Sequence, residues 1–198
     1  MIPIHLNYNF IETVFFDFDG VLVDSVPIKT KAYQEIFKPF GNDAVKLITE
    51  YHIANGGIDR YKKIEYVLNK LGKDIKFVNL LANEFATLVK DLVIQSESIP
   101  GMIELAVSLN KNSIPAYIVS GTPEIELTSI VESRNWQHHF KGVYGSPRTK
   151  VQIVDSIFEE HKYNRKKSIF IGDATTDYNT ALQCGVWYVG VPELENRE

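Results

Sequence analysis

Apolar residues follow two kinds of pattern along this chain. Four short, mostly apolar runs have the composition of buried strands, and the clearest of them stops abruptly at Asp17. These runs are residues 13–16, 114–119, 168–171 and 186–191. Between them, apolar positions recur every three or four residues, which predicts helices at residues 103–109, 124–132, 151–160 and 176–183. The alternation predicts an α/β fold built on a parallel sheet.

Residues 27–95 break this alternation, because they contain helical patterns but no comparable strand-like run. Candidate helices are residues 27–37, 44–54, 59–71 and 75–94, separated by breaks that contain glycine. We therefore expect a helical insert at residues 26–96. The core would consist of residues 1–25 and 97–198.

Carboxylates follow two of the predicted strands. Asp17 and Asp19 come directly after residues 13–16, and Asp173 and Asp177 follow residues 168–171. Ligands of open α/β sheets bind at the carboxyl ends of the strands, so these four side chains are expected in one site. Four carboxylates would repel one another, and a hard divalent cation with oxygen ligands relieves that repulsion. The pattern therefore predicts a Mg²⁺ site.

Groups that suit an anion accompany these acids. Ser120 and Gly121 end the predicted strand at residues 114–119 and precede a helix, where hydroxyl and backbone N–H groups can bind a phosphate. Lys150 adds a positive charge. A phosphate group is the ligand that this set favours.

The composition of the chain excludes several classes of binding partner. The chain of 198 residues has 21 Lys and Arg against 25 Asp and Glu, a net charge of −4, so it offers no broad basic field for nucleic acid or an anionic membrane. No apolar stretch approaches a membrane span of about 20 residues. Its one cysteine, Cys184, allows no internal disulfide. We expect a cytoplasmic protein whose partner is a small phosphorylated metabolite.

Four segments, in order, resemble the motifs of the haloacid dehalogenase superfamily. They read FFDFDGVLVDS from Phe15, IVSGT from Ile118, GSPRTK from Gly145 and IFIGDATTD from Ile169. The resemblance covers nearly the whole chain and is to the phosphatase branch with a helical cap. It implies a Rossmann-like core and a cap formed by the insert. In the third motif Val151 follows Lys150, where the family usually has proline, and Lys141 lies close upstream. Lys150 is the expected site lysine, and Lys141 is the alternative.

The resemblance also implies catalytic roles. Asp17 would attack phosphorus and form an aspartyl-phosphate. Asp19 would protonate the leaving alcohol and then deprotonate the hydrolytic water, and its acidic neighbours are expected to raise its pKa. Asp17, the backbone carbonyl of Asp19 and Asp173 would hold Mg²⁺, with Asp177 either a metal ligand through water or a group that orients the site.

The remaining groups would handle the substrate. Ser120, Gly121 and Lys150 would bind the transferred phosphoryl group. Arg60 in the insert would clamp an acidic part of the substrate. The alternative for Arg60 is a solvated helix face shared with Lys62 and Lys63.

The resemblance leaves more than one activity open. Asp19 disfavours dehalogenation, because release of a halide needs no acid at that position. Hydrolysis of a phosphate monoester is the preferred function. A sugar-phosphate mutase similar to β-phosphoglucomutase is the second candidate. A sensor that binds a phosphorylated metabolite without catalysis is the third.

Overall fold

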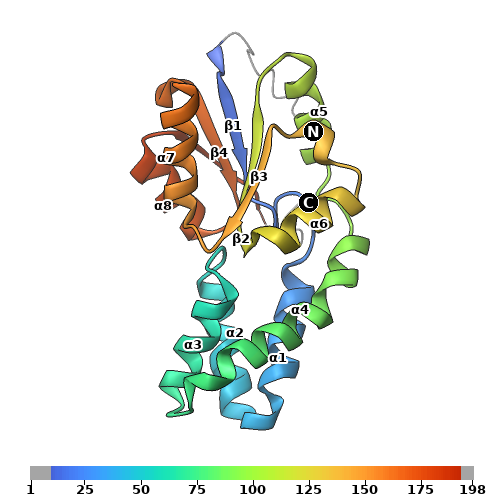
Figure 1. Ribbon diagram of the computed structural model, residues 1–198, viewed down its shortest axis with the longest axis vertical. Coiled ribbons are helices and arrows are strands. Elements are labelled where there is room, and N and C mark those ends of the chain that lie inside the picture. The colour runs from blue at the N-terminus through green and yellow to red at the C-terminus, as the bar shows by residue number, and fades with distance from the viewer. Residues whose placement is uncertain (1–9, 193–198) are drawn as a thin grey trace.

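The computed structural model describes residues 10–192 and contains one sheet of five parallel strands (Figure 1). The strands are β1 (Thr13–Phe16), β2 (Ala116–Pro123), β3 (Gly142–Ser146), β4 (Ser168–Gly172) and β5 (Trp187–Gly190). Their order across the sheet is β3-β2-β1-β4-β5. The predicted α/β parallel sheet is therefore confirmed.

Two layers of helices cover the sheet because both of its faces are apolar. Side chains of successive strand residues point to opposite faces, and in β1 Val14 and Phe16 join one buried cluster while Phe15 joins the other. The first cluster includes residues of α5 (Met102–Lys111) and α6 (Glu124–Ser133). The second includes residues of α7 (Lys150–His161) and α8 (Thr175–Cys184). This sandwich fixes the strand ends, where the acidic residues lie.

Four further helices form the insert at the carboxyl ends of the strands (Figure 1). They are α1 (Val26–Phe37), α2 (Asn42–Ala54), α3 (Arg60–Lys70) and α4 (Val78–Gln95). All four predicted helices of this region are present. The division into domains at residues 25/26 and 96/97 stays a prediction.

Two hydrogen bonds of one antiparallel bridge, between Val23 and Ser98, join the segments that lead into and out of the insert. Asp24 N donates to the carbonyl of Glu97 at 2.9 Å, and Ile99 N donates to the carbonyl of Leu22 at 3.1 Å. Arg134, at the end of α6, donates to three carbonyl groups at the end of α4 and just after it, those of Val93, Ile94 and Ser96. These bonds hold the point where the chain returns to the core.

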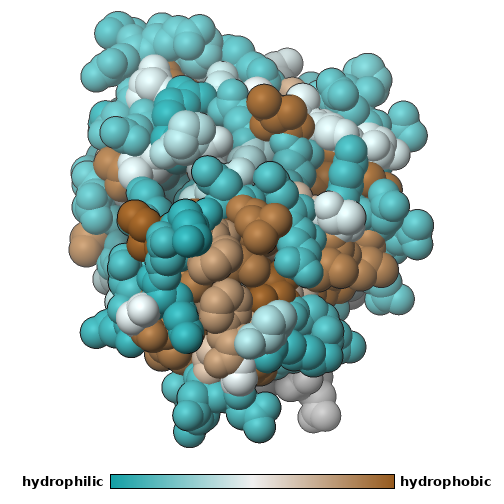
Figure 2. Space-filling view, turned by 60° about the horizontal axis from the view of Figure 1, so that its bottom comes forward, coloured by the Kyte–Doolittle hydropathy of each residue, from teal (hydrophilic) through white to brown (hydrophobic). Residues whose placement is uncertain are grey.

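The end of the molecule formed by the insert is partly apolar. Figure 2 shows a strip of apolar side chains there, flanked by hydrophilic ones. On α4, Leu80 and Leu92 are exposed. Within residues 10–192, none of the helices combines the length and the apolar character that a membrane crossing requires.

Candidate active site

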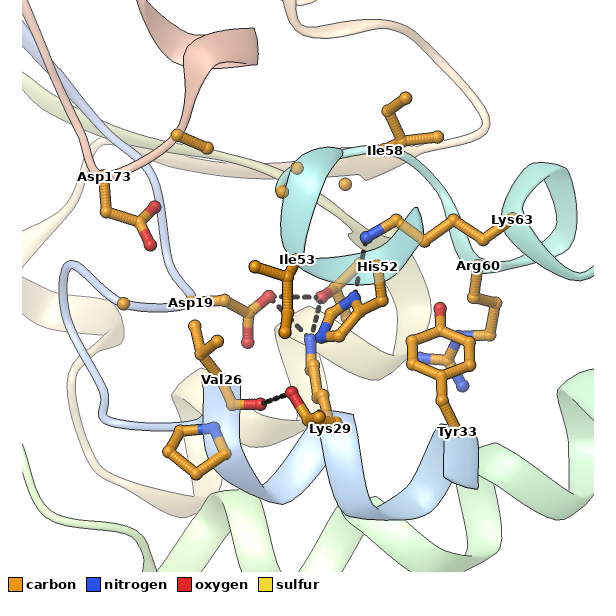
Figure 3. Close-up of a pocket in the computed structure, with 18 of the residues that line it drawn as sticks. Asp19, Val26, Lys29, Tyr33, His52, Ile53, Ile58, Arg60, Lys63 and Asp173 are labelled. Carbon is orange, nitrogen blue, oxygen red and sulfur yellow. Dashed lines mark hydrogen bonds and ion pairs between the residues drawn. The ribbon is translucent and has the colours of Figure 1, made fainter. Parts of the chain in front are cut away.

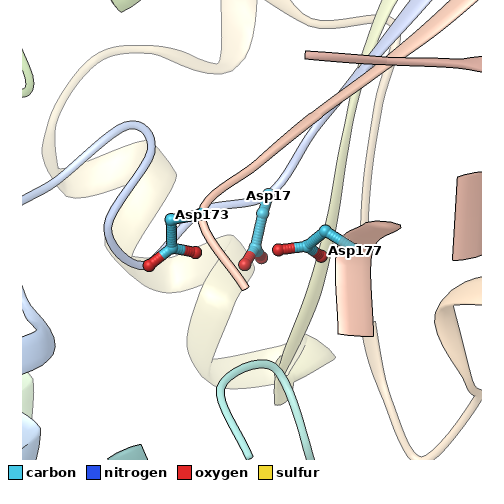
Figure 4. A group of neighbouring side chains, drawn as sticks. All are labelled: Asp17, Asp173 and Asp177. Carbon is cyan, nitrogen blue, oxygen red and sulfur yellow. The ribbon is translucent and has the colours of Figure 1, made fainter. Parts of the chain in front are cut away.

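Three carboxylates meet where β1 and β4 end. Asp17 follows β1 and Asp173 follows β4, and these strands are neighbours with Phe16 paired to Ile171. Asp177 lies on the first turn of α8. One carboxylate oxygen from each aspartate lies within 4.8 Å of the other two, and Figure 4 shows Asp17 between Asp173 and Asp177. Sheet register therefore brings together Asp17 and Asp173, which lie 156 positions apart in the sequence.

Lys150 is the lysine that the structure brings to these acids. As the first residue of α7, it places Nζ 2.9 Å from Asp17 Oδ1 and 2.6 Å from Asp177 Oδ1. Burial opposes its charge, but the two carboxylates outweigh this effect and raise the pKa of Lys150. Lys141 instead donates to the hydroxyl of Tyr163 at an exposed position.

The pKa values of two aspartates are raised. Burial, followed by the charge of Asp177, raises the pKa of Asp17 even though Lys150 opposes the shift. The same two causes raise the pKa of Asp173 to about 7. The single ammonium group of Lys150 therefore does not balance the negative charge of the three carboxylates. Three close carboxylate oxygens with an unmet demand for a cation fit Mg²⁺.

The side chain of Asp19 points away from Asp173 and is paired with Lys29 of the insert (Figure 3). Its Oδ2 accepts from Lys29 Nζ at 2.6 Å and from Thr122 Oγ1 at 3.0 Å, while Oδ1 accepts from Ser25 Oγ at 2.6 Å. Burial raises its pKa, but Lys29 and the hydroxyl donors outweigh burial and lower it to about 2. The expectation that acidic neighbours raise the pKa of Asp19 was therefore wrong. The cause is Lys29, ten residues further along the chain.

A loop of the insert covers the end of β2. The carbonyl of Gly57 packs against Gly121, where the Cβ of any other residue would collide with this backbone. Thr176 Oγ1 donates to the carbonyl of Gly56 at 2.5 Å, which ties the same loop to α8. Under this loop Asp17 is only 2% exposed. The structure thus shows a closed arrangement in which Asp17 and Asp177 are covered, while Asp173 faces the cavity described below.

Ser120 lies within β2 beside Gly121 and is 1% exposed. Its Oγ accepts a hydrogen bond from Thr122 N at 3.1 Å. Both predicted anion-binding residues of β2 are therefore at the sheet edge that carries the acids.

A cavity of about 700 Å³ lies between the insert and the sheet. From the core, its walls include Asp19, Gly121, Thr122 and Asp173. From the insert, they include Lys29, His52, Arg60 and Lys63. Such a space between two structural units is typical of a small-molecule site.

The basic residues of α3 do not form the solvated face weighed as an alternative. Lys62 is exposed, but Arg60 and Lys63 are buried. Arg60 Nη2 lies 2.5 Å from Glu126 Oε1, and its guanidinium lies 4.8 Å from the centre of the Phe85 ring. The pattern could have revealed this, because residues 60, 63, 64, 67 and 68 share one helix face whose other members are apolar.

The fold and this cluster define an α/β protein with an enzyme-like acidic site under a helical insert. Residues 14–191 match the family model described as haloacid dehalogenase-like hydrolase. The chain belongs to this family. The expected family and the expectation of a hydrolase are thus confirmed.

The individual proteins that this chain resembles have low sequence identity to it. Two curated proteins named phosphoglycolate phosphatase, from Pseudomonas putida and Pseudomonas aeruginosa, are each 23% identical over 190 and 185 residues. The matches cover 90% and 87% of this chain and 68% and 66% of those proteins, so the chain spans about two thirds of these relatives.

Solved structures share the fold. β-Phosphoglucomutase from Clostridium difficile has a TM-score of 0.77 at 20% identity, with 94% of this chain and 86% of that one covered. CbbY from Rhodobacter sphaeroides, in complex with phosphate, has a TM-score of 0.74 at 16% identity, with 95% and 89% covered.

Proposed function

We propose that this protein is a Mg²⁺-dependent phosphatase that hydrolyses a small phosphate monoester through an aspartyl-phosphate on Asp17. One observation carries the proposal: Asp17 lies at the end of β1 with its carboxylate 2.9 Å from Lys150 Nζ, in a cluster with Asp173 and Asp177. The names of the Pseudomonas relatives agree with a phosphatase.

Two displacements make up the reaction. Asp17 Oδ attacks phosphorus, the bond from phosphorus to the ester oxygen breaks, and that oxygen takes a proton from Asp19 and leaves as the alcohol. Water then gives a proton to Asp19 and attacks phosphorus. The bond from phosphorus to Asp17 Oδ breaks, which releases inorganic phosphate and restores the carboxylate of Asp17. The ammonium of Lys150 and the Ser120–Gly121 end of β2 would hold the phosphoryl oxygens, whose charge is spread in the transition state.

Asp17 and Asp173, with the backbone carbonyl of Asp19, would hold the metal. Asp177 would orient the site, since its Oδ1 binds Lys150 and its Oδ2 accepts from Ala174 N at 3.1 Å. Bound Mg²⁺ would neutralise negative charge on the phosphoryl group.

Asp19 would act as the acid and base only after it leaves Lys29, because the paired carboxylate is ionised. Asp17 likewise becomes accessible only after the loop at Gly56 and Gly57 lifts. Both requirements are met if the insert is a cap that opens to admit substrate. The cap then excludes water during attack on the ester.

Phosphate release from a panel of phosphorylated metabolites, with Mg²⁺ and with EDTA, tests the proposal. We expect release with Mg²⁺ only. Conversion of a sugar 1-phosphate to its isomer without phosphate release would instead identify a mutase. Tight binding of a metabolite without any conversion would identify a sensor.

A further inference from the structure

The cavity contains three buried basic side chains of the insert, and their partners differ. Lys29 is paired with Asp19, and Arg60 is paired with Glu126. Lys63 is 3% exposed and forms no ion pair within residues 10–192. A buried ammonium without a counter-charge is costly, so this position needs an explanation.

The partner of Lys63 is a histidine. Its Nζ lies 2.9 Å from His52 Nδ1, on the neighbouring helix α2 (Figure 3). His52 is 7% exposed. Burial, followed by the charges of Lys63 and Lys29, lowers the pKa of His52 to about 3, so the ring is neutral. A neutral ring whose Nδ1 accepts from Lys63 carries its proton on Nε2.

The position of this pair suits the far end of a bound substrate. His52 and Lys63 line the cavity from the insert, while Asp19 and Asp173 line it from the core, where phosphorus would react. An anion beside Lys63 would supply the missing counter-charge and a charge-assisted hydrogen bond. Burial and the nearby charge of Lys29 lower the pKa of Lys63 to about 7, and a bound anion would reverse that shift.

We propose that Lys63, positioned by His52, forms a subsite for a second anionic group on the organic part of the substrate. The substrate class is then a phosphate monoester that also carries a carboxylate or a second phosphate. This inference rests on the proposed phosphatase function and adds to it the chemistry of the leaving group.

Matched ester pairs test this subsite. The carboxylate arm compares phosphoglycolate with ethyl phosphate, and the phosphate arm compares glucose 1,6-bisphosphate with glucose 6-phosphate. We expect kcat/KM to favour the anionic member of at least one pair, and Lys63→Met to reduce that preference about tenfold, the worth of one charged hydrogen bond. Lys62→Met is the control, because Lys62 is the exposed neighbour on the same helix. The ester pair whose kcat/KM preference falls in Lys63→Met shows whether the subsite binds a carboxylate or a phosphate.

A binding measurement separates this inference from the phosphatase proposal. Calorimetric titration of phosphoglycolate, glucose 1,6-bisphosphate and inorganic phosphate into the parent and Lys63→Met proteins requires no turnover. We expect Lys63→Met to lower the affinity for one of the two organic anions about tenfold more than it lowers the affinity for inorganic phosphate. It should also raise the Tm of the unliganded protein, because an unpaired buried ammonium is removed. The subsite proposal would be overturned if the parent and Lys63→Met proteins had the same kcat/KM preferences and the same affinities relative to inorganic phosphate. If the protein hydrolysed no ester but bound an organic anion through Lys63, only the phosphatase proposal would be overturned.

Discussion

Lys29 Nζ lies 2.6 Å from Asp19 Oδ2, so the insert supplies the counter-charge of the second aspartate in the first motif. The same ammonium donates to Thr122 Oγ1 at 2.8 Å on β2. One lysine thus joins α1 to two segments of the core. Closure of the insert and the ionisation of Asp19 are therefore linked through this contact.

Lys29→Met should lower the free energy of unfolding at neutral pH by about 3 kcal/mol, because it leaves the carboxylate of Asp19 buried without its partner. Urea denaturation measures this loss. Lys31→Met is the matched control, since Lys31 is exposed on the same helix. Equal losses in the two variants would contradict the buried pair.

Lys150→Met should reduce kcat/KM for any hydrolysed ester at least about 100-fold, because the phosphoryl oxygens lose their charged donor. Lys141→Met should keep the parent value, since Lys141 contacts Tyr163 outside the acidic cluster. Steady-state kinetics of both variants decides between the two lysines. A larger loss with Lys141→Met would assign the role to Lys141.

Arg60 and Glu126 should act as a unit that holds the insert on α6. Their side chains are 5% and 14% exposed, so a double-mutant cycle of Arg60→Met and Glu126→Gln should give a coupling energy above about 1 kcal/mol in stability. Both single variants should change KM alike, because both loosen the insert. An increase in KM with Arg60→Met alone would instead place Arg60 on the substrate, the role predicted from the sequence.

Lys63 should make stability depend on pH. Its pKa falls from 10.5 to about 7 in the folded protein, so between these values the unfolded chain binds more protons and the free energy of unfolding rises with pH. The groups that act on it are His52 on α2, Lys29 on α1, Lys150 on α7 and the aspartates of the core. Denaturation of the parent and Lys63→Met across this range isolates the effect, and parallel pH curves would contradict it.

The sequence predicted the ends of β1, β4 and β5 to within one residue, because apolar runs stop sharply there. β2 runs on to Pro123, beyond the predicted end at residue 119. β1 has the predicted bounds, and the parallel register of β1 and β4 then places Asp17 beside Asp173. Strand β3 was missed, because GVYGS contains two glycines and too few apolar residues for a strand-like run. The pattern of apolar residues predicts a strand only where the strand is buried enough to consist mostly of apolar residues.

Contacts between the insert and the core could not be predicted in the same way. The pair of Lys29 and Asp19 depends on how α1 leaves the first motif, and nothing in the spacing fixes that direction. The burial of Lys63 beside an exposed Lys62 depends on the rotation of α3 against α2 and α4. Helical periodicity gives that rotation once Ile64, Val67 and Leu68 are taken as the inner face, but it does not identify His52 as the partner.

The state of Asp17 during turnover tests the central claim most directly. Protein quenched in acid during hydrolysis of a substrate found in the metabolite panel, then digested and analysed by mass spectrometry, should carry one phosphoryl group on the peptide that contains Asp17. Asp17→Asn should carry none and release no phosphate. Phosphate release by Asp17→Asn at the parent rate, or a phosphoryl group on a different residue, would contradict the account.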